Sequence, residues 1–211
     1  MKPIPSHELV GARHVGELPS ADMVDLWVAV SSAIVKYGFV IEYRDLEPPR
    51  TGIFDGLRIT IDPDVRFEMQ CFLLLHLFGH SVQWVAPSLA EKVAELKNTN
   101  DRSRFMRVLH DYEFEAARFG MQLMRECGVA GLDQWYSDFV GTDWRYVERF
   151  YETDRIPPWT ECIVNGCGLI QPAPIPPLAL RQHIRGSGLV PSPSSPRKRS
   201  TRPWNFRVQA A

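Results

Sequence analysis

The chain has 211 residues, 45% hydrophobic and 11% aromatic, a composition that suits one medium-sized domain with its own core. Its net charge of −1 conceals an asymmetry: residues 1–161 hold 17 Lys/Arg and all 25 Asp/Glu, whereas residues 162–211 hold 7 Lys/Arg and no acid. No run approaches the ~20 apolar residues of a membrane span, and the N-terminal residues lack the apolar core of a signal peptide. We therefore expect a cytoplasmic protein without membrane contacts, in which an acidic globular domain precedes a basic tail.

The first part of the chain predicts a helix followed by a small sheet. Apolar residues recur at helical spacing over 20–37. Alternating apolar residues at 39–46 predict a strand, and the segment 53–62 predicts two short strands that form a hairpin around Asp55 and Gly56.

The remainder of the domain predicts helices. Residues 66–86 are so strongly apolar that we expect a central, buried helix, and 88–97 predicts a shorter, more exposed one. The longest amphipathic pattern covers 103–127, and two further short helices are expected at 132–139 and 142–153. A small sheet near the N-terminus with helices behind it defines an α+β fold.

Composition divides the chain into four segments. We expect an N-terminal extension at 1–19, a globular domain at 20–160, a proline-rich segment at 161–181 that packs on the domain, and a basic low-complexity tail at 182–211. The last two segments are distinguished by their prolines, since 8 of the 17 in the chain lie within 162–211.

The tail combines four clustered cations with nearby aromatic residues. These cations are Arg197, Lys198, Arg199 and Arg202. They could contact nucleic acid, an acidic partner or the acidic domain itself. We favour a solvated extension because of the low-complexity composition, and we expect no nucleic-acid binding except through this tail.

Cys162 and Cys167 flank a predicted turn and raise the question of a redox or metal site. Their four-residue spacer is looser than the two-residue spacer of a zinc knuckle. Reduced thiols are the simpler interpretation, and a disulfide or metal role stays open.

Two histidines in the apolar helix are the first candidates for metal ligands. His76 and His80 are four residues apart, so both imidazoles lie on one helix face and can reach one ion at ~2.0–2.1 Å. The alternative is that both are neutral core histidines whose nitrogens bond to backbone groups.

A third ligand has to come from another element, and the long downstream helix carries two glutamates. Glu113 and Glu115 are two apart and point in different directions, so only one can face the histidines. We favour Glu113, because the small Ala116 and Ala117 would let the two helices approach, and we keep Glu115 as second choice.

The segments "DGLRITID", "FEMQCFLLLHLFGHSVQW" and "DYEFEAARFGMQLM" together resemble the ImmA/IrrE group of small bacterial zinc metallopeptidases. Members of that group typically show H-E-x-G-H followed by E-x-E-A-x-x-F-A, for which this chain has "HLFGH" and "EFEAARFGM". The resemblance covers roughly residues 20–155. It implies a zincin-like minimal metallopeptidase fold, zinc bound by His76, His80 and Glu113, and peptidase activity often aimed at a transcriptional repressor.

The chain departs from the family pattern at two positions. Leu77 replaces the glutamate that would act as general base, whose help is worth typically ~10²–10⁴-fold in rate. Ala117 stands where related proteins often place a polar residue that orients a ligand. Glu115 is a possible substitute base, although nothing in the sequence places it within reach.

These features lead to two functional hypotheses. The first is a zinc-binding, zincin-like protein that is weakly active or a pseudoenzyme, and that acts on or binds a protein or peptide partner such as a transcriptional regulator. The second is a helical binding or regulatory protein without metal, in which His76 and His80 are core residues.

Overall fold

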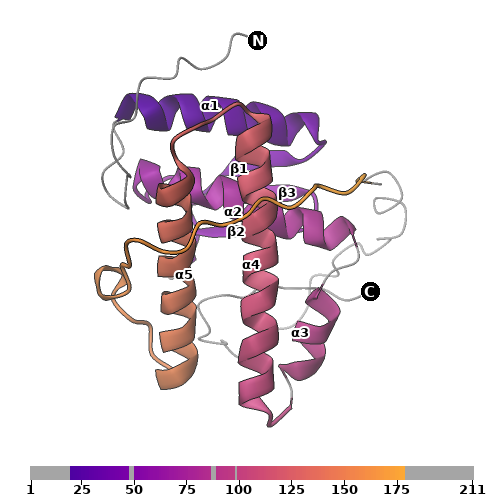
Figure 1. Cartoon of the computed structure of the whole chain (residues 1–211), viewed down its shortest axis with the longest axis vertical. Helices are drawn as coiled ribbons and strands as arrows, with labels where there is room; N and C mark the ends of the chain where they lie inside the picture. The colour runs from indigo at the N-terminus through magenta and orange to yellow at the C-terminus, as the bar shows by residue number, and fades with distance from the viewer. Residues whose placement is uncertain (1–19, 48–49, 87–88, 98, 179–211) are drawn as a thin grey trace.

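The computed structural model describes residues 20–47, 50–86, 89–97 and 99–178, and within them five α-helices and one three-stranded sheet form an α+β fold (Figure 1). The expected extension at 1–19 and the basic tail with Arg197, Lys198, Arg199 and Arg202 lie outside the described residues. None of the helices in these ranges has the length and apolar character needed to cross a membrane.

The elements follow the predicted order closely. In chain order they are α1 (Ser20–Lys36), β1 (Val40–Tyr43), β2 (Gly52–Phe54), β3 (Arg58–Ile61), α2 (Phe67–Val85), α3 (Ala90–Leu96), α4 (Arg102–Glu126), α5 (Asp133–Thr153) and a 3-10 turn η1 (Trp159–Glu161). The predicted hairpin is confirmed, because β2 pairs antiparallel with β3.

The central strand of the sheet is β3, and β1 pairs with it in parallel. Ile59 and Ile61 of β3 have no exposed surface and belong to the main core together with α2. The strand β2 also packs closely on α2, since a Cβ atom at Gly52 would be 2.9 Å from a Leu77 methyl carbon. The sheet therefore covers one side of α2.

The helix α2 is the centre of the molecule, as predicted from its apolar sequence. Every residue in 71–83 is buried, including the histidines. The helix α1 contacts it from one direction and α4 from another, and α4 and α5 stand side by side across it (Figure 1). No side of the middle of α2 faces solvent, so any polar group there must find its partners within the protein.

Two glycines let α2 and α4 cross at very short distance. A Cβ atom at Gly79 of α2 would collide with the backbone carbonyl of Ala116 in α4. In the reverse direction, a Cβ atom at Gly120 of α4 would lie 2.8 Å from the carbonyl oxygen of Leu75 in α2. Each helix thus supplies a glycine where the backbone of the other passes, and no larger residue fits at these two positions.

The prediction of two short helices at 132–139 and 142–153 was wrong, because α5 is continuous through Gly141. A glycine in mid-helix costs roughly 0.5–1 kcal/mol relative to alanine, and tertiary packing supplies the reason for it here. A Cβ atom at Gly141 would collide with the Cys167 sulfur and lie 3.1 Å from a Val164 methyl carbon.

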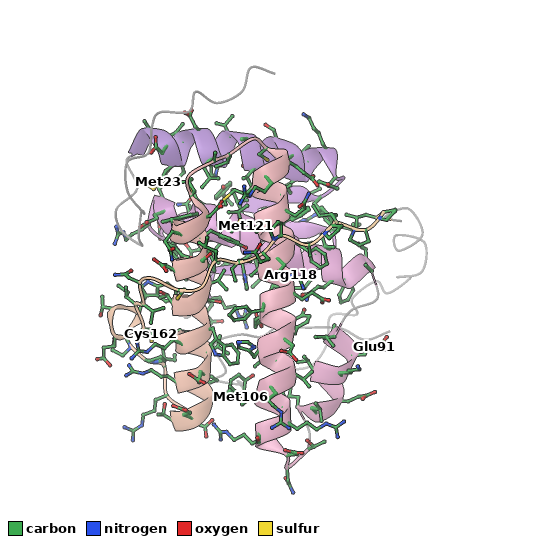
Figure 2. The ribbon with its side chains drawn as sticks, viewed as in Figure 1. Met23, Glu91, Met106, Arg118, Met121 and Cys162 are labelled. Atoms are coloured by element: carbon green, nitrogen blue, oxygen red, sulfur yellow. The ribbon has the colours of Figure 1, made fainter. Side chains whose placement is uncertain are left out.

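The segment after η1 runs extended across α5 and α4 (Figure 1). Three of its backbone N–H groups donate hydrogen bonds to side chains of α5. Val164 donates to Thr142 (3.1 Å), Cys167 to Asp138 (2.8 Å) and Ile170 to Ser137 (3.0 Å). At the α4 end of the segment, Arg118 binds it through side chain and backbone, with Nε donating to the Gln171 carbonyl (3.2 Å) and its own carbonyl accepting from the Ala173 N–H (3.2 Å) (Figure 2).

Cys162 and Cys167 lie in this segment as free thiols. Burial raises the pKa of both, and Asp138 reinforces the effect at Cys167. Since metals and disulfide chemistry require the thiolate, this environment favours the interpretation that both are structural.

The close crossing predicts a strong and local sensitivity to added volume. Gly79→Ala should lower the free energy of unfolding by about 1–3 kcal/mol or more, because the methyl group meets backbone that cannot rotate away. Urea unfolding followed by circular dichroism measures the change. Gly168→Ala is the matched control, since no described residue lies within 4 Å of a Cβ there, and it should stay within about 0.5 kcal/mol. Equal stability of the two variants would contradict the packing described.

Candidate metal centre

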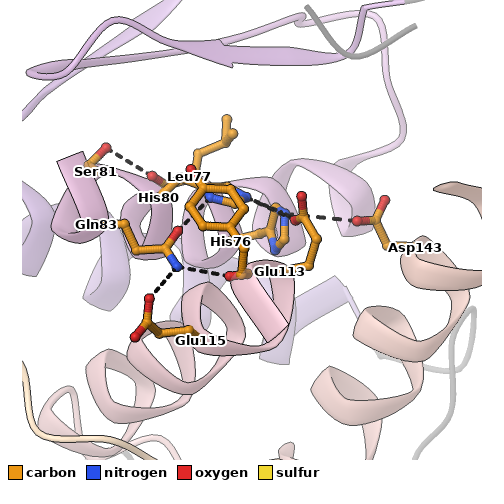
Figure 3. Close-up of polar contacts among 9 residues, drawn as sticks. His76, Leu77, His80, Ser81, Gln83, Glu113, Glu115 and Asp143 are labelled. Atoms are coloured by element: carbon orange, nitrogen blue, oxygen red, sulfur yellow. Dashed lines mark hydrogen bonds and ion pairs between the residues drawn. The ribbon is translucent and has the colours of Figure 1, made fainter. Parts of the chain in front are cut away.

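Three side chains predicted as metal ligands meet where α2 and α4 cross (Figure 3). His76 and His80 stand one turn apart on α2, and their Nε2 atoms are 3.0 Å from each other. Oε2 of Glu113 on α4 is 3.2 Å from His76 Nε2 and 3.1 Å from His80 Nε2. The three donor atoms form a nearly equilateral triangle, and the residues make up a possible metal-binding triad.

The triangle has a size that suits a small divalent ion. A tetrahedral zinc with bonds of about 2.0–2.1 Å sets its ligand atoms about 3.3–3.4 Å apart, slightly more than the 3.0–3.2 Å seen between these atoms. Two imidazole nitrogens and one carboxylate oxygen are also the donor types of the His₂Glu class of zinc sites.

Gln83, which was not predicted from the sequence, determines which nitrogen of His80 carries the proton and which faces the triad. The Gln83 amide nitrogen donates to the Tyr112 carbonyl and to the Glu115 carboxylate, both at 2.8 Å. The reversed amide would place its oxygen against two acceptors, so Oε1 must be the atom that faces His80 Nδ1 at 2.9 Å. Nδ1 therefore carries the proton of a neutral His80, and Nε2 turns its lone pair towards Glu113.

Converging acceptors favour a positive charge at this place. His80 Nε2 and Glu113 Oε2 both offer lone pairs, and the third atom, His76 Nε2, brings at most one proton when neutral. A buried cluster of this kind is satisfied either by an extra proton on a histidine or by a metal ion that all three bind. The sequence signal for Gln83 was its position three residues after His80, on the same side of the helix.

Glu113 is ionised in this environment. Its burial opposes the charge, but the neighbouring His80 and His76 outweigh that effect through charge and hydrogen bonds and lower the pKa of Glu113 to about 2. Glu115, the second candidate for ligand or base, lies outside the triad, and its part-buried carboxylate accepts a hydrogen bond from Gln83 (Figure 3).

A second carboxylate near the triad comes from α5. Asp143 is 5% exposed, and its Oδ2 lies 3.8 Å from His76 Nε2 (Figure 3). Burial raises the pKa of Asp143 to about 7, with the His76 charge opposing and the Glu113 charge adding to the shift. No spacing rule links Asp143 to the two histidines, so it could not be predicted from the sequence.

Aromatic rings enclose the two imidazoles. Phe54 of β2 stacks on His80 with ring centroids 5.8 Å apart, and Phe72 stacks on His76 at 5.3 Å. His76 Nδ1 has no hydrogen-bond partner among the described residues. A metal-binding histidine usually donates its other N–H to a carbonyl or carboxylate. On the side away from the triad, His76 is therefore held by packing, whereas His80 is held by its contact with Gln83.

Leu77 does not face the triad. It has no exposed surface, and it packs against Gly52 of β2. The position expected to carry a catalytic base is thus part of the core between α2 and the sheet. The triad itself is 2%, 0% and 5% exposed at His76, His80 and Glu113, so a peptide cannot reach it in this conformation.

Comparison with protein-family models, with curated proteins and with solved structures gave no match. The fold and the site define an α+β protein with a possible His₂Glu metal centre. Any closer assignment has to come from the geometry of the centre and from the motifs that build it.

The Gln83 network predicts that metal affinity depends on a residue that does not touch the metal. Gln83→Leu removes the acceptor that holds the His80 ring and tautomer, and zinc affinity should fall about 10–100-fold. Competition with a chromophoric chelator measures the affinity.

Gln122→Leu is the control for that variant, since its amide donates to Glu126 on the surface of α4, away from the triad. It should bind zinc as the parent does. Equal zinc affinity in Gln83→Leu and Gln122→Leu would mean that Gln83 plays no part in presenting His80.

Proposed function

We propose that this chain is a zincin-like metal-binding protein that holds zinc through His76, His80 and Glu113 and has lost conventional peptidase chemistry. The observation that carries the proposal is the triangle of three donor atoms 3.0–3.2 Å apart, in which Gln83 fixes the lone pair of His80. An α+β fold with its small sheet against the histidine-bearing helix is compatible with the family resemblance.

Zinc is the metal that the donor set favours. Imidazole suits zinc, copper, iron and nickel, whereas a hard cation such as magnesium or calcium prefers oxygen ligands throughout. When bound, zinc supplies Lewis-acid polarisation and lowers the pKa of a coordinated water.

Two features argue against hydrolysis. No carboxylate occupies position 77, and general-base help is worth about 10²–10⁴-fold in rate. In addition, the three ligands are at most 5% exposed, which leaves no approach for a substrate. From the resemblance we extend the proposal to the protein's role, which is to bind a protein or peptide partner, such as a transcriptional regulator.

A metal-free core is the second candidate. In that candidate, the buried histidines and Glu113 share a proton in place of a metal ion. The 3.0–3.2 Å distances between their atoms suit charge-assisted hydrogen bonds. The two candidates differ in one measurable property, the metal content of the purified protein.

Metal analysis decides between them. The protein should contain about one zinc per chain, and the zinc should be lost in His76→Ala and in Glu113→Ala. His110→Ala is the control, since His110 lies on the same α4 helix with 40% of its side chain exposed and outside the triad. A parent protein that neither contains zinc nor takes it up after removal of bound metal would establish the metal-free candidate.

Position 77 provides a separate test of the lost chemistry. Leu77→Glu places a carboxylate in the core beside Gly52, and the free energy of unfolding should fall by roughly 3–5 kcal/mol, as for an unpaired buried charge. Leu77→Met is the control and should cost less than about 1.5 kcal/mol. Thermal unfolding and cleavage of a peptide library are the measurements. If Leu77→Glu proved as stable as Leu77→Met and cleaved peptides in a zinc-dependent manner, the closed-site interpretation would be wrong.

A further inference from the structure

The three ligands of the triad leave one position of a tetrahedral metal site unfilled. Catalytic zinc sites keep that position for water or substrate, whereas structural sites fill it with a fourth protein ligand. Which kind of site this is depends on what the protein places beside the triangle of donor atoms.

Asp143 is the group that α5 places there. It is buried, its Oδ2 lies 3.8 Å from His76 Nε2, and it points to the triad from the side opposite Gln83 (Figure 3). Within the described part of the chain, no lysine or arginine pairs with it. An ionised carboxylate buried without a cation is costly, so Asp143 keeps its negative charge only where a positive charge lies nearby.

The charges of the site balance when a divalent ion is present. Neutral His76 and His80 contribute no charge, and the carboxylates of Glu113 and Asp143 contribute two negative charges when both are ionised. One divalent cation neutralises both carboxylates in a volume that is almost closed to water. Among the described residues, a protonated histidine is the other cation that could pair with either carboxylate.

On the basis of the proposed function, we infer that Asp143 is the fourth protein ligand and closes the metal site. The donor atoms within 4.8 Å of one another belong to His76, His80 and Glu113. Asp143 stands outside this set. To bind the same ion, its carboxylate has to move closer to the triad when the ion enters. The ion then links α2, α4 and α5, and its role is structural.

Cobalt(II) substitution tests the coordination without any enzymatic assay. A closed site of four protein ligands gives intense visible absorption bands that do not change when azide is added, because no position is open to the anion. In Asp143→Ala the position is open, so azide should shift the bands, and zinc affinity should fall at least about tenfold. Asp143→Asn keeps the shape of the side chain and removes its charge, and it should also lose affinity.

Glu148→Ala is the matched control, since Glu148 is exposed on the same helix. It should bind cobalt as the parent does, with bands insensitive to azide. Circular dichroism of each variant checks that the helices are retained. Zinc should raise the Tm of the parent and of Glu148→Ala by more than it raises the Tm of Asp143→Ala.

The outcomes separate this inference from the proposal on which it rests. A parent that binds cobalt with azide-sensitive bands, and whose affinity is unchanged in Asp143→Ala and Asp143→Asn, overturns the role of Asp143 and leaves the three-ligand site in place. A parent that binds neither cobalt nor zinc overturns the metal site itself, and the inference about Asp143 falls with it.

Discussion

The crossing of α2 and α4 at Gly79 and Gly120 is the constraint on which the rest of the structure depends. Each glycine lies against the backbone of the opposite helix, so the two helix axes come closer than side chains would allow. A glutamate side chain is short, and Glu113 reaches both imidazoles only because its helix passes so near. The triad is thus a consequence of the packing, and Glu113 is selected over Glu115 by the face of α4 that the crossing turns inward.

The same packing gives the site its electrostatic character. It removes water from two imidazoles and two carboxylates, and groups of this kind are stable in a core only when their charges and hydrogen bonds are matched. Gln83 provides part of that matching, because it satisfies His80, the Tyr112 carbonyl and Glu115 with one amide. Among the described residues, His76 has no equivalent partner at Nδ1, and on that side its ring is stacked against Phe72.

Features encoded by local spacing could be predicted from the sequence. The pair His76 and His80 follows from the helical repeat, the hairpin from Asp55 and Gly56, and the buried character of α2 from its continuous apolar run. The choice of Glu113 followed from Ala116, whose backbone does lie against Gly79.

What escaped prediction depends on contacts between distant segments. Asp143 belongs to the site only because α5 packs beside α4, and glycine is needed at position 141 because the Cys167 sulfur lies where a Cβ atom would be. The parallel pairing of β1 with β3 likewise requires a connection whose path no local pattern reveals. A spacing rule cannot find such features, because the residues involved share no helix or hairpin.

Leu77 and Asp143 both determine whether a metal held by the triad could catalyse hydrolysis. A hydrolytic zinc centre needs a base next to a water and an open position where that water binds. Leucine at position 77 packs in the core against β2 and cannot act as a base. Asp143 as a fourth ligand would fill the position that the water needs, so the two residues together would replace catalysis with a metal-dependent link between three helices. In a protein built this way, metal occupancy would govern how rigidly α2, α4 and α5 are held, and therefore the shape of the surface that these helices present to a partner.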